Sequence, residues 1–259
     1  MSNLIIGFVC SCAGLCIGSF LNVCISRLPQ GLSIVHPGSR CPQCATPIRF
    51  YDNIPVLSYL LLGARCRSCG GRISVRYPAI ELLTGAMACG LVLKYGLTFS
   101  ALIYFLFIAA LIVVAFIDLD HRIIPDHISL PGIAAGLVAS VILPEITWTE
   151  SLIGIAAGGG SLFAVAMGYY LLTGKEGMGG GDIKLLAMIG AFTGWQGIAF
   201  TIFAASATGT AVGLVLMASA GKNLKFAVPF GPFLSLGAGV YLFFGQEIIH
   251  WYLMGFRPY

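Results

Sequence analysis

Long apolar runs dominate this chain and restrict the folds that it can adopt. Hydrophobic residues make up 58% of it and charged residues only 9%, whereas ordinary globular domains carry about 25% charged residues. A soluble core could not bury this much apolar surface, and runs of about 20 apolar residues span a bilayer as helices. The sequence therefore predicts an all-α polytopic membrane protein with about eight transmembrane helices. The predicted helices are Leu4–Ile25, Pro78–Lys94, Thr98–Ile117, His127–Leu143, Ser151–Thr173, Ile183–Trp195, Gln196–Ser219 and Val228–Met254.

The sixth predicted helix, Ile183–Trp195, is short. At about 1.5 Å per residue it reaches only part-way across a bilayer. It must therefore be tilted or continuous with the seventh helix, with the boundary expected at Gly194-Trp195.

The basic residues indicate an orientation, because cytosolic loops of membrane proteins are enriched in Lys and Arg. Twelve of the 14 basic residues are expected on one side, which we take as the cytosol, with both chain ends outside. The net charge of +4 reflects this topology. We therefore expect contact with membrane lipid and no nucleic-acid partner. The twelve are Arg27, Arg40, Arg49, Arg65, Arg67, Arg72, Arg76, Arg122, Lys175, Lys184, Lys222 and Lys225, and the other two are Lys94 and Arg257.

Four of the nine cysteines form two C-x-x-C pairs in the loop 26–77, Cys41 with Cys44 and Cys66 with Cys69. Pairs separated by 21 residues, as here, are typical of a tetrahedral thiolate zinc site. Redox-active cysteines are the alternative, and a reducing cytosol disfavours structural disulfides. Four protein ligands leave no open coordination position, so the zinc is expected to be structural.

Two aspartates stand next to predicted helix ends on the expected cytosolic side. Asp118, in FIDLDHRIIPD, directly follows the predicted helix Thr98–Ile117, and Asp182 opens the helix Ile183–Trp195. Acidic groups in membrane helices are costly and usually functional. Two carboxyl groups held close together share a proton, and such a pair can activate water and protonate a leaving amine. The pattern indicates aspartic protease chemistry.

Helix capping is the alternative role for these aspartates, because Asp is a favoured N-cap residue. At Asp182 the three preceding glycines, Gly179, Gly180 and Gly181, favour catalysis, since a loop without side chains lets a peptide backbone approach a carboxylate. Asp126 is expected to cap the helix His127–Leu143. Asp120 points to a different helix face from Asp118 and is expected to be solvated or to attract a basic substrate.

Several motifs together resemble one family. GGGD (Gly179–Asp182) matches the GxGD motif of intramembrane aspartyl proteases, and FIDLDHRIIPD resembles the first aspartate motif of the type IV prepilin peptidases. GSFLNVCISRLP (Gly18–Pro29), the two C-x-x-C pairs and RYPAIELLTG (Arg76–Gly85) resemble the N-terminal half of that family. The motifs occur in the family's order and cover nearly the whole chain.

The resemblance implies a bifunctional enzyme of the bacterial inner membrane. Such enzymes cleave the leader of prepilins or pseudopilins at the cytosolic face, then methylate the new N-terminus with S-adenosylmethionine. Asp118 and Asp182 would be the catalytic pair in a peptidase domain, residues 95–259. Residues 1–94 would be associated with methyl transfer. Glu81 is a candidate there, and pairing with Arg76 or helix capping is its alternative role.

Two other functional classes remain open. A membrane transporter would use broken helices and buried acids near the midplane, whereas these acids are predicted at helix ends on one face and no half of the chain is repeated. A non-catalytic docking protein with a zinc loop is the other. A zinc metalloprotease is disfavoured, because the chain has no H-E-x-x-H motif.

Overall fold

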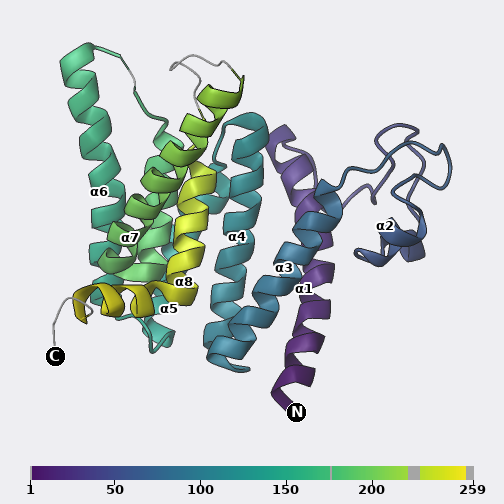
Figure 1. Cartoon of the computed structure of the whole chain (residues 1–259), viewed down its shortest axis with the longest axis horizontal. Helices are drawn as coiled ribbons and strands as arrows, with labels where there is room; N and C mark the ends of the chain where they lie inside the picture. Colours follow the sequence, from purple (N-terminus) through teal and green to yellow (C-terminus); the bar gives the residue numbers. More distant parts are fainter. Residues whose placement is uncertain (1, 176, 221–227, 255–259) are drawn as a thin grey trace. The chain divides into compact units, whose positions relative to one another are not determined.

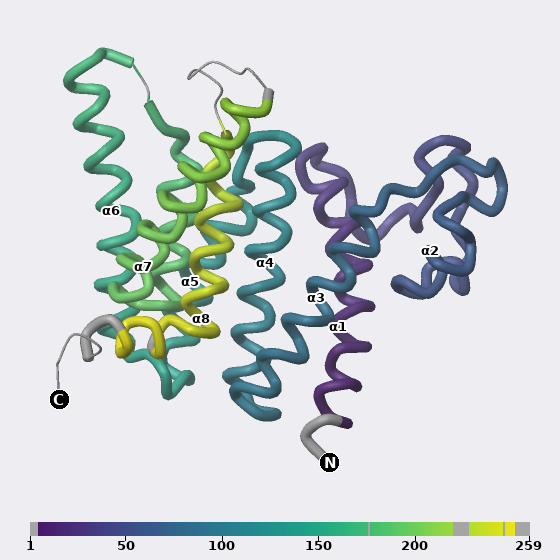
Figure 2. The backbone as a smooth tube through the Cα atoms, in the orientation of Figure 1, coloured from purple at the N-terminus to yellow at the C-terminus, as the bar shows by residue number. Residues whose placement is uncertain are grey.

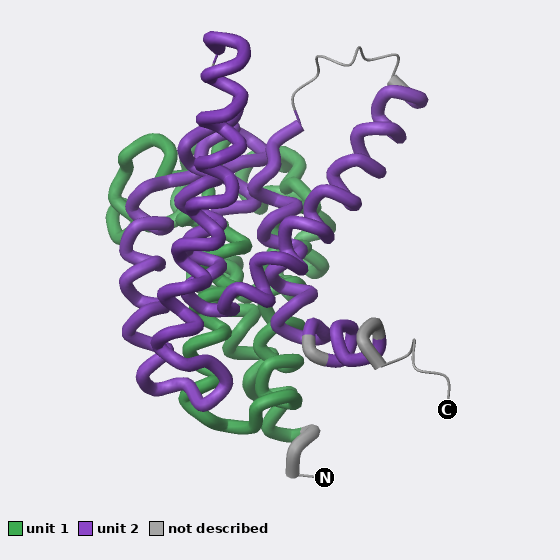
Figure 3. The backbone as a smooth tube through the Cα atoms, turned by 90° about the vertical axis from the view of Figure 1, so that its left-hand side faces the viewer, with its two compact units in different colours: residues 1–113 green, residues 114–259 purple. Residues whose placement is uncertain are grey.

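The computed structural model describes residues 2–175, 177–220 and 228–254. The chain forms two compact units, residues 1–113 and 114–259 (Figure 3). Each unit is described separately below. Lys222, Lys225 and Arg257, for which the sequence predicts a side of the membrane, lie outside the described residues.

The core of the first unit is a pair of helices that lie side by side, α1 (Ser2–Arg27) and α3 (Arg76–Tyr95) (Figure 1). Gly14 and Gly18 bring their backbones together. A Cβ atom added at Gly14 would lie 2.7 Å from the Cβ of Ala88, and one at Gly18 would lie 2.7 Å from the Cα of Glu81. Small residues four apart allow such close helix contact in membranes. The packing sets Glu81 directly against α1.

The segment between these helices is mostly irregular. It contains two 3₁₀ turns, η1 (Leu28–Gln30) and η2 (Phe50–Asn53), and the short helix α2 (Leu57–Leu61). Figure 2 traces it as a folded loop beside α1 and α3. Two isolated β-bridges, Arg40 with Pro47 and Arg65 with Arg72, close the two C-x-x-C turns.

Helix α4 (Phe99–His121) runs from the first unit into the second. We expected the helix to end at Ile117, and this boundary is wrong. The helix continues for one further turn, so Asp118 and Asp120 both lie within it. The apolar run ends before the helix does, because Asp120 and His121 in the last turn are exposed and need no apolar surroundings.

In the second unit, α7 (Gly180–Ala220) packs against α5 (Asp126–Ile142), α6 (Trp148–Thr173) and α8 (Gly231–Met254). Glycines again permit the closest approach. A Cβ added at Gly154 of α6 would lie 2.2 Å from the carbonyl oxygen of Gly190. A Cβ added at Gly190 would lie 2.1 Å from the carbonyl oxygen of Gly154. The part of α7 just before Gly194 thereby packs closely against α6.

Helix α7 is interrupted at Gly194, where the backbone has φ 67° and ψ −176°. Glycine adopts this left-handed φ without steric cost. The interruption lies at the expected boundary between Ile183–Trp195 and Gln196–Ser219, so the prediction of two helical segments there is confirmed.

Within the described residues, five helices are long and apolar enough to cross a membrane, α1, α3, α4, α6 and α7, whereas α5 and the apolar part of α8 are shorter. The prediction of an all-α membrane protein is confirmed. The number of eight transmembrane spans stays a prediction.

Candidate active site and metal centre

Asp118 lies in the last turn of α4 and its side chain is buried, with 5% exposed. The backbone N–H of Gly231 donates a hydrogen bond to its Oδ2 over 3.0 Å. Gly231 is the first residue of α8, and the free N–H groups at a helix N-terminus favour a negative partner. The start of α8 therefore holds one oxygen of this carboxyl group in place.

Asp182 lies in the first turn of α7 and is half-buried. Its carboxyl group is near enough to Asp118 for their charges to interact. The structure thus brings together two acids that are 64 positions apart in the sequence.

The glycines before Asp182 differ in their surroundings. A Cβ added at Gly179 or Gly180 would meet no atom within 4 Å, whereas one at Gly181 would lie 2.9 Å from the Cβ of Ile124. The first two therefore face open space. The third has a packing reason to be glycine.

Gly231 was not among the site residues expected from the sequence, and its contact leads to a test. A Cβ at this position would lie 2.7 Å from Oδ2 of Asp118, so Gly231→Ala should push the carboxyl group out of place. A displacement of about 1 Å can cost about 100-fold in rate, and we expect a loss of peptidase activity of that order. The measurement is cleavage of a prepilin in membranes at matched expression. Gly213→Ala is the control, because a Cβ there meets nothing within 4 Å; equal activity of both variants would show that the Gly231 contact is dispensable.

The other two aspartates have different surroundings. Asp120 is exposed, in agreement with its expected position on another helix face. Asp126 does not cap α5, because Pro125 occupies the N-cap position and no side chain caps the helix. Asp126 instead accepts hydrogen bonds from Nζ of Lys184, with both distances 2.8 Å. This ion pair ties the start of α5 to the first turns of α7.

The four loop cysteines lie on two turns of the same construction. In the first, the N–H of Cys41 donates to the carbonyl of Thr46 and the N–H of Ala45 donates to that of Cys41. In the second, Cys66 donates to Gly71, and Gly70 donates to Cys66. The residue after each C-x-x-C pair has a left-handed φ, 57° at Ala45 and 69° at Gly70. The two sulfur atoms of each turn therefore lie close to the two sulfur atoms of the other turn.

The sulfur atoms form a cluster with the dimensions of a tetrahedral zinc site. The four Sγ atoms all lie within 4.8 Å of one another, and those of Cys41 and Cys69 are 3.9 Å apart. A tetrahedral site with Zn–S bonds of about 2.3 Å requires S···S distances of about 3.8 Å. The residues present thus fit a metal ion, and four thiolates would complete its coordination.

The thiol groups of this cluster differ in pKa. Hydrogen bonding to the side chain and the backbone of Thr46 lowers the pKa of Cys44 to about 6. Backbone N–H groups of Cys69 and Ser68 lower that of Cys66. At Cys69 the backbone N–H of Gly71 acts in the same direction, but the neighbouring thiols outweigh it and raise the pKa to about 11. Four thiolates together need a compensating cation, because a coordinating metal ion deprotonates its thiols outright.

Glu81, on α3, is buried, with 8% of its surface exposed. Its Oε2 accepts a hydrogen bond of 2.7 Å from the N–H of Val56, and the Ser19 side chain hydrogen-bonds the same carboxyl group. Glu81 does not cap α3, since it lies five residues after the helix begins. The roles of Val56 and Ser19 were not expected, because neither has a sequence signal that links it to Glu81.

Two family models match the chain. The model of the bacterial peptidase A24 N-terminal domain matches residues 12–95 and that of the type IV leader peptidase family matches residues 105–214. Three relatives are each named prepilin leader peptidase/N-methyltransferase. The one from Pseudomonas aeruginosa is 36% identical over 269 residues, with 94% of this chain and 93% of that protein covered. That from Pseudomonas putida is 37% identical (91% and 89% covered), and that from Myxococcus xanthus is 41% identical (81% and 62% covered).

No solved structure matches the chain. The family resemblance seen in the motifs is confirmed by the family models and by these relatives. This chain belongs to the type IV leader peptidase family.

Proposed function

We propose that this protein cleaves the leader of prepilins or pseudopilins with an aspartate pair and then methylates the new N-terminus. The observation that carries the proposal is the juxtaposition of Asp118 and Asp182, whose charges interact although they come from different helices of the second unit. The printed names of the relatives support both activities.

In the proposed peptidase reaction, the two carboxyl groups share one proton. The ionised partner takes a proton from a water molecule as it attacks the scissile carbonyl, and the protonated partner gives its proton to the leaving amine. The Gly231 N–H holds Oδ2 of Asp118, which leaves Oδ1 for the reaction. The open space at Gly179 and Gly180 admits the substrate backbone beside Asp182.

We assign methyl transfer to residues 1–94 and peptide cleavage to residues 95–259. The division is supported by the two family models, whose matches meet between residues 95 and 105. S-adenosylmethionine supplies the methyl group, and Glu81 is the acid that we associate with this reaction.

The cysteine cluster holds one structural zinc ion in this proposal, through Cys41, Cys44, Cys66 and Cys69. A closed site of four thiolates contributes folding energy and no reactive position. The distribution of basic residues supports an inner-membrane protein whose loop 26–77 and aspartate pair face the cytosol.

Mass spectrometry of a co-expressed prepilin tests both activities in one measurement. The expected product lacks its leader and carries one additional methyl group at the new N-terminus. An intact prepilin is the result expected of a transporter or a docking protein, and it would refute the peptidase assignment. A cleaved but unmethylated product would refute only the methyltransferase assignment.

A further inference from the structure

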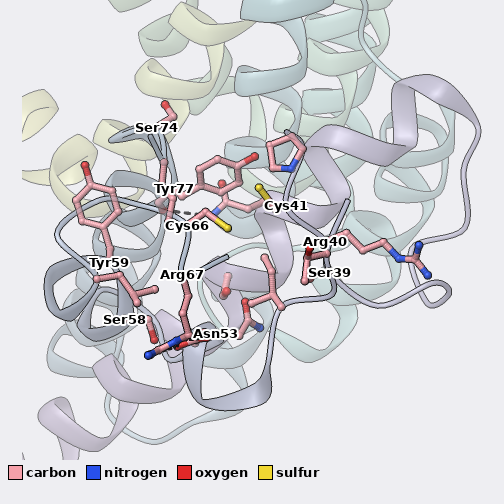
Figure 4. A pocket seen from close by; sticks show the side chains of 18 of the residues that line it. Ser39, Arg40, Cys41, Asn53, Ser58, Tyr59, Cys66, Arg67, Ser74 and Tyr77 are labelled. Atoms are coloured by element: carbon pink, nitrogen blue, oxygen red, sulfur yellow. Dashed lines mark hydrogen bonds and ion pairs between the residues drawn. The ribbon is translucent and has the colours of Figure 1, made fainter. Parts of the chain in front are cut away.

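The first unit contains a cavity of about 550 Å³. It lies between the C-terminal end of α1, the start of α3 and the cysteine loop, all of which belong to that unit. Its volume is typical of small-molecule sites, which measure about 300–1,000 Å³. In Figure 4 the sulfurs of Cys41 and Cys66 lie near the centre of the view, with Tyr77 just above them, Tyr59 on the left and Arg40 on the right.

Helices α1 and α3 contribute two buried polar side chains to the lining of the cavity. Glu81 and Asn22 are each 8% exposed. The Asn22 amide nitrogen donates to the carbonyls of Gly18 and Tyr77, both over 3.2 Å, so the group that it can offer a ligand is its carbonyl oxygen. This end of the cavity therefore presents oxygen acceptors.

The surroundings of Glu81 leave its charge without a counterion inside the described part of this unit. Its hydrogen-bond partners, the N–H of Val56 and the Ser19 hydroxyl, are neutral. A buried carboxylate held by neutral donors is costly unless a cation is supplied. The backbone of Val56, which makes this contact, has a φ of 59°. This value is an outlier for a β-branched residue, and strained backbone of this kind is concentrated at functional sites.

The lining of the cavity also contains basic residues. Four arginines line it: Arg27, Arg40, Arg67 and Arg72. Arg67 is paired with Asp52 over 2.7 Å, which lowers the pKa of that carboxyl group, and Arg27 donates to the carbonyls of Ser33 and Gly38. The cavity thus combines a buried acid, four arginines and two tyrosine rings.

We propose that this cavity binds S-adenosylmethionine, with the Glu81 carboxylate as the counterion of the sulfonium. The ligand carries a permanent sulfonium charge, a carboxylate and an adenine ring, and these match the buried acid, the arginines and the tyrosines. Glu81 acts here as a binding and positioning residue. The proposal rests on the methyltransferase activity proposed above, and it adds the donor site and the group that recognises the donor's charge.

The test compares two ligands that differ at sulfur. Equilibrium dialysis on the purified full chain in lipid nanodiscs, without prepilin, gives the dissociation constants of S-adenosylmethionine and of its neutral thioether product, S-adenosylhomocysteine. The wild type should prefer the sulfonium. Glu81→Gln should weaken sulfonium binding by about tenfold, because the attraction between the carboxylate and the sulfonium charge is lost, and leave thioether binding within about twofold, so that the preference disappears.

Glu150→Gln is the matched control. Glu150 caps α6 in the second unit through a capping box with Thr147, and glutamine serves equally in that motif, so both dissociation constants should equal those of the wild type. An unchanged sulfonium preference in Glu81→Gln would overturn the proposal.

Photolabelling provides a second measurement that does not depend on the variant folding. Irradiation of the wild-type protein with radiolabelled S-adenosylmethionine should attach label to peptides from the cavity wall, and label confined to residues 114–259 would overturn the proposal. If the protein methylates prepilin but binds no donor in this cavity, only the proposed S-adenosylmethionine site is refuted. If the protein neither methylates prepilin nor binds the donor, the methyltransferase function itself is refuted.

Discussion

Replacing either Asp118 or Asp182 with asparagine is expected to abolish prepilin cleavage while the protein still inserts in the membrane. Each step of the proposed reaction needs a carboxyl oxygen that can gain or lose a proton, and asparagine provides none. A general acid or base contributes about 10²- to 10⁴-fold to a rate, so the residual activity should be near the detection limit. The measurement is the fraction of prepilin cleaved over time by membranes that contain equal amounts of each variant.

The same substitution at two neighbouring aspartates is the control for this experiment. Asp120 is exposed, and Asp126 pairs with Lys184 at a position where both side chains are partly exposed. An exposed ion pair contributes about 1 kcal/mol or less. Asp120→Asn and Asp126→Asn should therefore keep substantial activity. Cleavage at the wild-type rate by Asp118→Asn would exclude the aspartate pair as the catalytic group.

Removing zinc should have the largest effect on the first unit. We expect about one zinc ion per chain, and Cys41→Ser should release it because one of four ligands is lost. Structural zinc contributes about 10–16 kcal/mol in zinc-finger peptides, so the loop 26–77 should lose its fold. Zinc content by elemental analysis and protease sensitivity of the loop measure the two effects. Because Cys41 and Cys66 also line the cavity, methylation should fall at least as much as cleavage.

Cys12→Ser is the matched control for the zinc experiment, because Cys12 is an exposed thiol on α1 away from the cluster. This variant should keep its zinc. In the wild type, the four loop thiols should resist alkylation until a chelator is added. Rapid alkylation of all four in freshly purified protein would exclude the metal site.

The parts of this structure that local sequence encodes were predictable. Apolar runs predict membrane helices because a bilayer leaves the backbone no other means of satisfying its hydrogen bonds. The spacing of Cys41, Cys44, Cys66 and Cys69 predicts a metal site because each C-x-x-C turn is formed by hydrogen bonds among neighbouring residues of the sequence. The interruption of α7 at Gly194 was expected for a similar reason, since glycine permits the left-handed φ.

Contacts between distant residues account for what the sequence did not predict. Gly231 is 113 positions from Asp118. The residues around Gly231, a glycine before a proline at a helix start, do not indicate which distant side chain its N–H will bind. Asp126 has the residue type of an N-cap, but Pro125 takes that position and Lys184 competes for the carboxylate. Only the tertiary packing decides between such roles.

The interruption of α7 at Gly194 also has a consequence for the surrounding lipid. The helical segment 180–193, which contains Asp182, is about 21 Å long at about 1.5 Å per residue, while the hydrocarbon core of a bilayer is about 30 Å thick. Helix α5, with 17 residues, reaches about 25 Å. Hydrophobic mismatch of this kind is relieved by local thinning of the bilayer. Thinned lipid beside the second unit would bring water to the aspartate pair and shorten the stretch of substrate helix that must unwind before its peptide bond can be cut.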